Sequence, residues 1–144
     1  MEALSFLEPL NRLAGVKADW VGRIPGVPVE VDRDQAMCRL KSSHREAVVA
    51  GYGREIWWRA EQVHGSGVAV VPTTHLWMAG DGLPVVPGVD GLLTAAPGEV
   101  LGIYVADCGA IWVADRRTGA VGLLHSGKKG TEAGILGVAV RMME

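Results

Sequence analysis

The stretch Val105-Ala106-Asp107-Cys108 and, one hairpin later, the stretch His125-Ser126-Gly127-Lys128-Lys129-Gly130 decide how this chain folds. In the first stretch an apolar strand runs into a cysteine, and in the second a returning strand ends at a histidine. The loop Arg116-Arg117-Thr118-Gly119 between them predicts the hairpin turn, because glycine accepts the positive φ that such a turn requires. A glycine- and lysine-rich segment then opens a helix, so a thiol, an imidazole and an anion-binding loop are expected close together.

The hairpin also predicts a candidate metal site. Within it His125 is expected opposite Ala110 or Ile111, which places Cys108 within diagonal reach of the imidazole. His64 likewise ends an apolar strand before glycines, and a metal with ligand bonds of about 2.0–2.3 Å could join all three side chains. Three protein ligands with an open fourth position are typical of a catalytic zinc. Spacing alone leaves a second interpretation open, in which the cysteine is a core thiol and both histidines bind backbone.

The remaining elements are predicted from periodicity and turn residues. Asp32 or Asp34 is expected to cap a helix over about 33–50 that Gly51-Tyr52-Gly53 ends. The stretch 72–88, rich in proline and glycine, is expected to form a long loop. Strands are expected at 56–63, 68–71, 89–94, 100–106, 110–114 and 120–124, those at 100–106 and 110–114 buried on both faces. Thr131 is the predicted N-cap of a closing helix over 132–143.

Composition places the chain among folded globular proteins. Of its 144 residues 49% are hydrophobic and 21% are charged, the net charge is −2, and the length suits a single domain over residues 1–144. No basic stripe indicates nucleic acid, and no apolar run approaches the roughly 20 residues of a membrane helix. With no secretory pattern at the N-terminus, Cys38 and Cys108 are expected to be reduced thiols of a cytoplasmic protein.

Four motifs in this order resemble one protein family. They are Gln62-Val63-His64-Gly65, Val89-Asp90-Gly91-Leu92-Leu93-Thr94, Ala106-Asp107-Cys108 and His125-Ser126-Gly127-Lys128-Lys129-Gly130-Thr131. Together they look like the bacterial family first named multicopper polyphenol oxidase, or laccase-like, and now better known as a purine nucleoside phosphorylase family. The resemblance covers residues 55–143 well and 1–54 loosely.

The resemblance implies a zinc ion on His64, Cys108 and His125, and an α+β fold. That fold is a mixed α/β sandwich whose sheet and flanking helices are similar to the cysteine-hydrolase domain of certain bacterial deamidating toxins. The implied activities are phosphorolysis of adenosine, inosine or methylthioadenosine and deamination of adenosine, with a nucleoside and phosphate as partners. Family members continue well beyond residue 144. The chain is therefore expected to lack part of the family's C-terminal half, and to be a truncated member, a fragment or a half that needs a partner. A homo-oligomer would cover its exposed face.

Roles for single residues follow from their chemistry and from the family pattern. A zinc ion would acidify a water for attack on C6 of adenosine. Asp107 is expected to act beside Cys108 in catalysis, orienting a ligand or accepting a proton. Asp90, before Gly91, is expected only to form a turn.

A phosphate site is expected at the start of the closing helix, on Lys128, Lys129 and Gly130. Arg23 loosely matches an arginine that the family places near its site, and it is assigned to phosphate or substrate. The family usually has Trp-Arg where this chain has two lysines, and proline where it has Gly109. Lysine keeps the positive charge but not the bidentate contact of arginine.

Four functions remain open at this point. The leading hypothesis is a zinc-dependent purine nucleoside phosphorylase with adenosine deaminase activity. A second is copper-dependent oxidation of polyphenols, for which so few cysteines and histidines do not supply several copper centres. A third is a metal-free hydrolase with Cys108 as nucleophile and His125 as base. The fourth is a non-catalytic domain that serves as a subunit or a binding module.

Overall fold

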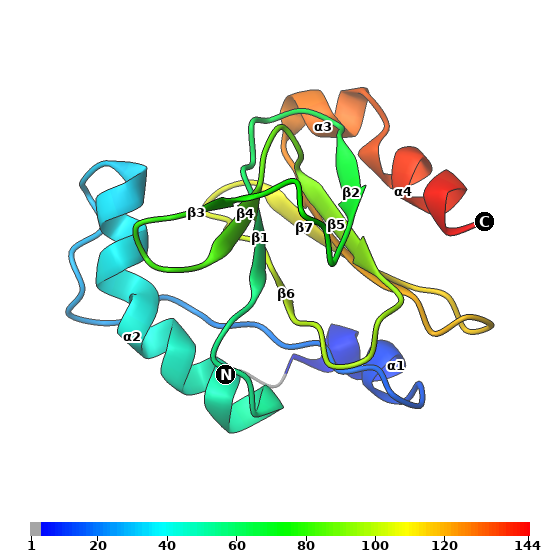
Figure 1. Ribbon diagram of the computed structural model, residues 1–144, viewed down its shortest axis with the longest axis horizontal. Helices are drawn as coiled ribbons and strands as arrows, with labels where there is room; N and C mark the ends of the chain where they lie inside the picture. The colour runs from blue at the N-terminus through cyan, green and yellow to red at the C-terminus, as the bar shows by residue number, and fades with distance from the viewer. Residues whose placement is uncertain (1–3) are drawn as a thin grey trace.

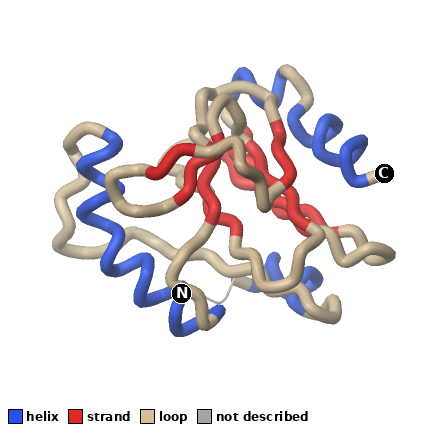
Figure 2. The backbone as a smooth tube through the Cα atoms, in the orientation of Figure 1, coloured by secondary structure: helices blue, strands red, loops and turns tan. Residues whose placement is uncertain are grey.

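The computed structural model describes residues 4–144, whose strands form two four-stranded sheets flanked by helices (Figure 1; Figure 2). The helices are η1 (Ser5–Leu7), α1 (Glu8–Asn11), α2 (Arg33–Tyr52), α3 (Lys128–Glu132) and α4 (Ile135–Met143). The strands are β1 (Trp58–Ala60), β2 (Val68–Val70), β3 (Trp77–Met78), β4 (Pro84–Val86), β5 (Gly91–Thr94), β6 (Leu101–Gly102), β7 (Gly109–Ala114) and β8 (Val121–Ser126). The mixed α/β class expected from the sequence is confirmed.

The two sheets differ in how their strands are paired. The first has the order β3-β4-β1-β6, with β1 parallel to both of its neighbours. The second has the order β2-β5-β8-β7, in which β8 runs antiparallel to β5 and to β7. The β7–β8 hairpin pairs Ala110 with His125, one of the two registers expected from the sequence.

Two apolar clusters hold these layers together. One joins the sheets through Ala60, Val71, Val86 and Leu92. The other packs α4 on the second sheet through Leu93, Leu124, Ile135 and Ala139. All four residues of β5 are buried, so this strand belongs to the core that both clusters share.

The long helix α2 lies beside the first sheet and is stabilised at its ends (Figure 1). Asp32 is its N-cap and accepts a hydrogen bond from Gln35 N at 3.0 Å, while Gly53 ends it at φ 66°. The expected capping is therefore confirmed, with Asp32 rather than Asp34 as the cap. None of the helices in the described part of the chain combines the length and apolar character needed to cross a membrane.

Several strand predictions are wrong. The stretch 72–88 contains β3 and the fully buried β4, which its prolines and glycines concealed. The strand expected at 56–63 ends at Ala60, because Gln62 adopts a left-handed φ of 62°. The strand expected at 100–106 is confined to β6. Strand β7 is half-buried rather than buried on both faces, because it lies at the edge of its sheet.

The closing helix also differs from its prediction. It begins at Lys128 with Gly127 as N-cap, and Gly134, at φ 76°, divides it into α3 and α4. Thr131 is not the cap. Its hydroxyl instead donates to Gly127 O at 2.6 Å from inside α3.

Close packing in the second sheet gives a test of this core. A Cβ on Gly122 would clash with buried Leu93 and lie 2.7 Å from Val113 Cγ2. We expect Gly122→Ala to lower the free energy of unfolding by about 1–3 kcal/mol, as overpacking does. In α4 the matched change Gly137→Ala meets only the flexible Arg141 side chain, and it should stabilise the helix by about 0.5–1 kcal/mol. Urea denaturation measures both, and equal effects would contradict the packing described here.

Candidate metal centre

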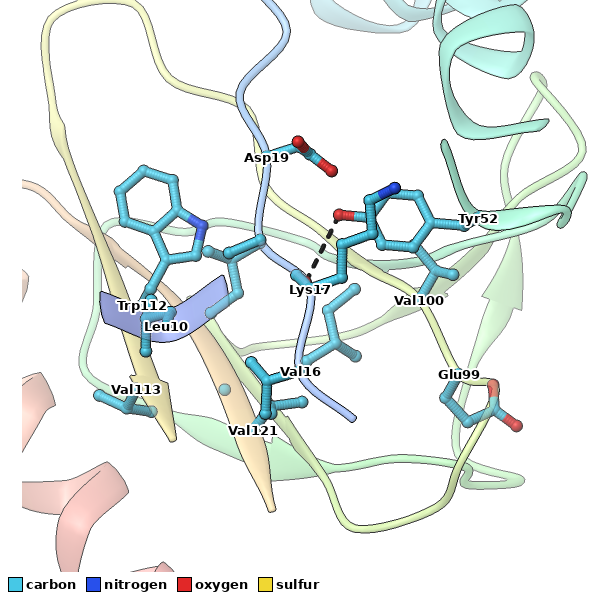
Figure 3. Close-up of a pocket in the computed structure, with 14 residues that line it drawn as sticks. Leu10, Val16, Lys17, Asp19, Tyr52, Glu99, Val100, Trp112, Val113 and Val121 are labelled. Carbon is cyan, nitrogen blue, oxygen red and sulfur yellow. Dashed lines mark hydrogen bonds between the residues drawn. The ribbon is translucent and has the colours of Figure 1, made fainter. Parts of the chain in front are cut away.

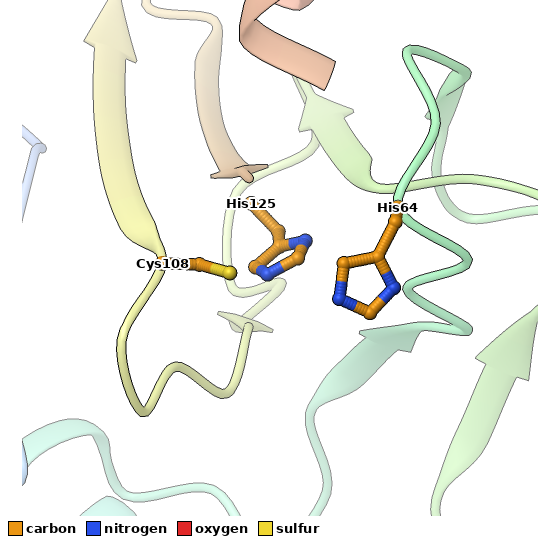
Figure 4. Close-up of side chains that lie close together, drawn as sticks. All are labelled: His64, Cys108 and His125. Carbon is orange, nitrogen blue, oxygen red and sulfur yellow. The ribbon is translucent and has the colours of Figure 1, made fainter. Parts of the chain in front are cut away.

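Three segments bring His64, Cys108 and His125 together at one end of the second sheet (Figure 4). Their potential ligand atoms all lie within 4.8 Å of one another. His64 follows β1, Cys108 directly precedes β7, and His125 lies near the end of β8. The three side chains therefore lie close enough together to share one ligand, as the first of the two sequence interpretations expects.

Exposure to solvent differs across this cluster. His125 is 3% exposed, Cys108 is half-buried and His64 is exposed. The two imidazole rings meet edge to face, with centroids 5.4 Å apart and planes at 79°. The cluster is therefore anchored at His125 and open to solvent at His64.

Asp90 is the buried group that orders both histidines. Its carboxylate has no exposed surface, and one oxygen lies 2.7 Å from His125 Nδ1. A proton on Nδ1 donates to this carboxylate, which leaves Nε2 as the free lone pair. Metal-binding histidines commonly show this pairing, because the carboxylate fixes the tautomer and the orientation of the ring.

The same carboxylate holds the turn that presents His64. It accepts hydrogen bonds from the backbone N–H groups of Val63, His64 and Gly65 at 2.9, 3.1 and 3.0 Å. His64 adopts a left-handed φ of 63°, a conformation that costs a residue with a Cβ free energy. Three hydrogen bonds to one buried carboxylate offset that cost.

The sequence interpretation missed this role of Asp90. An aspartate before glycine is the ordinary pattern of a turn, and this pattern gives no indication that the carboxylate also binds the two histidine segments. The signal that could have revealed it is position, because Asp90 directly precedes the apolar residues Leu92 and Leu93 of a predicted strand. A carboxylate placed there is buried, and a buried carboxylate must be hydrogen-bonded.

The surroundings of Cys108 keep its thiol protonated in the absence of a cation. Desolvation, and then the charge of Asp107, raise the pKa of Cys108 above its ordinary value, and Asp90 adds to the shift. The Asp107 carboxylate lies 3.7 Å from the sulfur. A metal-free hydrolase needs the opposite shift, since the thiolate is the nucleophile.

An open groove of about 460 Å³ extends from Cys108 along α3. Its lining residues are Asp107, Cys108, Gly109, Ser126, Gly127, Lys128, Thr131 and Glu132. Of the residues assigned to phosphate, Lys128 therefore faces the groove, and Lys129 is exposed on α3.

The other two assigned residues lie differently. Gly130 is buried, and a Cβ there would stand 2.6 Å from Gly65 O, so this position packs α3 closely against the His64 turn. Arg23 is exposed, does not line the groove, and makes no hydrogen bond or ion pair within residues 4–144. The structure thus brings Asp107 and Lys128 beside Cys108 and gives Arg23 no contact there.

A second, smaller cavity of about 100 Å³ lies between the N-terminal arm and the second sheet (Figure 3). One carboxylate oxygen of Asp19, which lines it, is buried and has no hydrogen-bond partner among residues 4–144. Burial, and then the Asp19 carboxylate, raise the pKa of Tyr52. This cavity shares no lining residue with the groove, so it forms no part of the histidine–cysteine cluster.

The chain is thus a mixed α/β protein in which two histidines and one cysteine form a cluster that could hold a metal ion. Residues 27–144 match the family model described as multi-copper polyphenol oxidoreductase laccase. The chain therefore belongs to this family, and the family resemblance noted in the sequence is confirmed.

Named relatives agree with that membership. The purine nucleoside phosphorylase YlmD of Geobacillus stearothermophilus is 42% identical over 99 residues, which are 68% of this chain and 36% of that protein. A purine nucleoside phosphorylase of Deinococcus radiodurans is 31% identical over 121 residues, 84% of this chain and 43% of the relative. The chain thus spans about two fifths of the length of the curated relatives it matches.

Solved structures show the same fold. The crystal structure of Geobacillus stearothermophilus YlmD matches with a TM-score of 0.62 at 32% identity, over 81% of this chain and 43% of that chain. The hypothetical protein YfiH of Bacillus licheniformis also gives a TM-score of 0.62, at 26% identity and the same coverage.

The role of Asp90 is testable without any ligand. Asp90→Asn keeps the size of the side chain but replaces an acceptor oxygen by a donor that faces other donors. We expect it to lower the free energy of unfolding by about 1.5–3 kcal/mol, the value of hydrogen bonds to a charged group. Asp107→Asn is the matched control, and because Asp107 is exposed it should change stability by less than about 0.5 kcal/mol. Denaturation followed by tryptophan fluorescence compares them, and equal losses would refute this role of Asp90.

Proposed function

We propose that this chain carries the metal centre of a zinc-dependent purine nucleoside phosphorylase with adenosine deaminase activity. The observation that carries the proposal is the convergence of His64, Cys108 and His125 ligand atoms within 4.8 Å. Family membership and relatives named purine nucleoside phosphorylase support the reaction class. Because the chain matches about two fifths of those relatives, the activity of a whole family member is part of the proposal.

The donor set fits zinc. Two imidazoles and one thiolate are ligands that zinc takes in catalytic sites, where a fourth position stays open. The hydrogen bond of His125 to Asp90 leaves Nε2 as the atom available to a metal. A zinc ion bound there would supply a Lewis acid. It would also supply the positive charge that favours Cys108 as a thiolate.

Copper is the alternative metal, and the family description carries its name. A polyphenol oxidase of the multicopper kind needs several copper centres. Of the four histidines in the sequence, His44 lies against Tyr104 and His75 is exposed on a loop, and neither joins the cluster. The described residues contain this single cluster of candidate ligands, whereas a multicopper oxidase needs several, so one metal ion is proposed here.

The groove beside Cys108 would hold the substrates. In phosphorolysis the bond from the sugar C1′ to the purine N9 breaks, a phosphate oxygen bonds to C1′, and the purine leaves with a proton. Lys128 supplies a positive charge in the groove for phosphate, with Lys129 near it on α3. Asp107, at the same rim, would hydrogen-bond a sugar hydroxyl or hold a proton. In deamination water adds at C6 and ammonia leaves.

Zinc binding is tested by elemental analysis of the purified protein. Wild type should retain zinc in stoichiometric amount. Cys108→Ala should lose most of it, because the thiolate is one of three protein ligands. Cys38→Ala removes the other cysteine, which is exposed on α2, and should leave zinc content unchanged. Retention of copper would overturn the choice of metal, and unchanged zinc in Cys108→Ala would overturn the site.

Activity is tested by incubating the protein with adenosine or inosine and measuring the purines released by chromatography. Adenine or hypoxanthine should form only with phosphate, whereas inosine should form from adenosine without it. Lys128→Ala should raise KM for phosphate about tenfold or more, because a charge-assisted hydrogen bond contributes about 1.5–3 kcal/mol. Arg116→Ala, an equal loss of charge on the distant hairpin loop, is the control. Failure to release any purine in the presence of bound zinc would favour the non-catalytic alternative.

A further inference from the structure

A buried glutamine links the two segments that carry His64 and Cys108. Gln62 is 5% exposed, and its side-chain amide meets the backbone of Tyr104 at two points. Its Nε2 donates to Tyr104 O at 2.7 Å, and its Oε1 accepts from Tyr104 N at 2.8 Å. A primary amide bound in this way reproduces both hydrogen bonds that a neighbouring strand would offer.

The Gln62 side chain makes its hydrogen bonds to Tyr104 just beyond the end of the β1–β6 pairing. Strands β1 and β6 pair as far as Arg59 with Gly102, where β6 ends, and β1 ends one residue later at Ala60. The backbone of Gln62 turns away with a left-handed φ, and its N–H donates to Val89 O at 2.9 Å. Its carbonyl accepts from Arg33 at 3.2 Å. Because the backbone N–H and C=O groups of Gln62 bond to Val89 and Arg33, the contact with Tyr104 is made by the Gln62 side chain.

The segment that Gln62 holds runs from Tyr104 to Cys108, where β7 begins and Gly109 pairs with Ser126. The Tyr104 side chain is fixed as well, since its hydroxyl accepts from Trp57 Nε1 at 2.9 Å. Among residues 4–144, the main-chain hydrogen bonds of residues 104–107 are the two made to Gln62. Asp90, which orders both histidines, makes no hydrogen bond to this segment. Cys108 therefore lies between two anchors, the Gln62–Tyr104 pair before it and β7 after it, and Asp90 hydrogen-bonds to neither.

We infer that Gln62 is a positioning residue that sets where the Cys108 thiol stands relative to His64 and His125. The inference rests on the proposed metal centre and deepens it. The centre then consists of a histidine pair fixed by Asp90 and a cysteine held by β7 on one side and by the Gln62–Tyr104 pair on the other. Loss of the glutamine amide releases the cysteine while both imidazoles keep their places.

Cobalt(II) is the probe for this inference, because a thiolate bound to it gives a charge-transfer absorption that imidazoles alone do not give. Gln62→Met keeps the approximate shape and removes both hydrogen bonds. Gln62→Glu keeps the acceptor for Tyr104 N and places a second acceptor against Tyr104 O. Both variants should lose most of the thiolate band and bind cobalt about tenfold or more weakly, as expected for loss of a group that orients a ligand. Gln35→Met, on the exposed face of α2, should match wild type.

Asp90→Asn provides the contrasting result. It disturbs the histidines and leaves the Gln62–Tyr104 pair in place, so it should weaken cobalt binding while the remaining complex keeps its thiolate band. A wild-type band and affinity in Gln62→Met would overturn the inference. Should the methionine variant fail to fold in a thermal melt, the isosteric Gln62→Glu carries the same comparison.

A second measurement needs no metal and separates this inference from the proposed function. In a Cys38→Ala background, Cys108 is the single thiol, and its alkylation rate reports how freely its segment moves. Gln62→Met should be alkylated severalfold faster than the background protein, and Gln35→Met should not. If wild type binds no cobalt, the metal proposal fails while this rate still decides the role of Gln62. Equal rates would show that the glutamine does not hold the cysteine segment.

Discussion

The candidate site depends above all on one buried carboxylate. Asp90 is fully enclosed, and a charge in that position is tolerated only when donors surround it. Four donors do so, three from the turn at His64 and one from the ring of His125. The left-handed turn, the tautomer of the buried imidazole and the approach of two distant segments all follow from this one requirement.

Elements with a local cause could be predicted from the sequence. Asp32 and Gly53 end α2 through interactions with their own neighbours, and Gly119 shapes a turn within its own hairpin. Strands β3 and β4 could not be predicted in this way. Pro84 lies within β4 and pairs with Met78, and only burial between the other strands makes that stretch a strand. The short β1 and β6 likewise end where tertiary contacts to Gln62 replace the ladder.

The same distinction applies to the site. The sequence predicts His64, Cys108 and His125 together from expected strand ends and from the family resemblance, although in the structure β1 ends at Ala60, before the turn that carries His64. Asp90 and Gln62 were not predicted with them, because their partners lie 25 or more residues away and their residue types match ordinary turn or strand positions. The residue type of a ligand indicates its chemistry, whereas the residue that orients the ligand can be recognised only once the fold has brought the two together.

The two histidines and the cysteine are held by different groups of the fold. The histidines share one buried anchor, so a disturbance at Asp90 reaches both at once. Cys108 is half-buried between the Tyr104 main chain, which bonds to the Gln62 side chain, and strand β7, which pairs with β8 from Gly109 onward. It also lines the groove where Asp107 and Lys128 lie. The thiol beside the proposed substrate groove is therefore held by its own two flanks, and the carboxylate that orients the histidines makes no hydrogen bond to either.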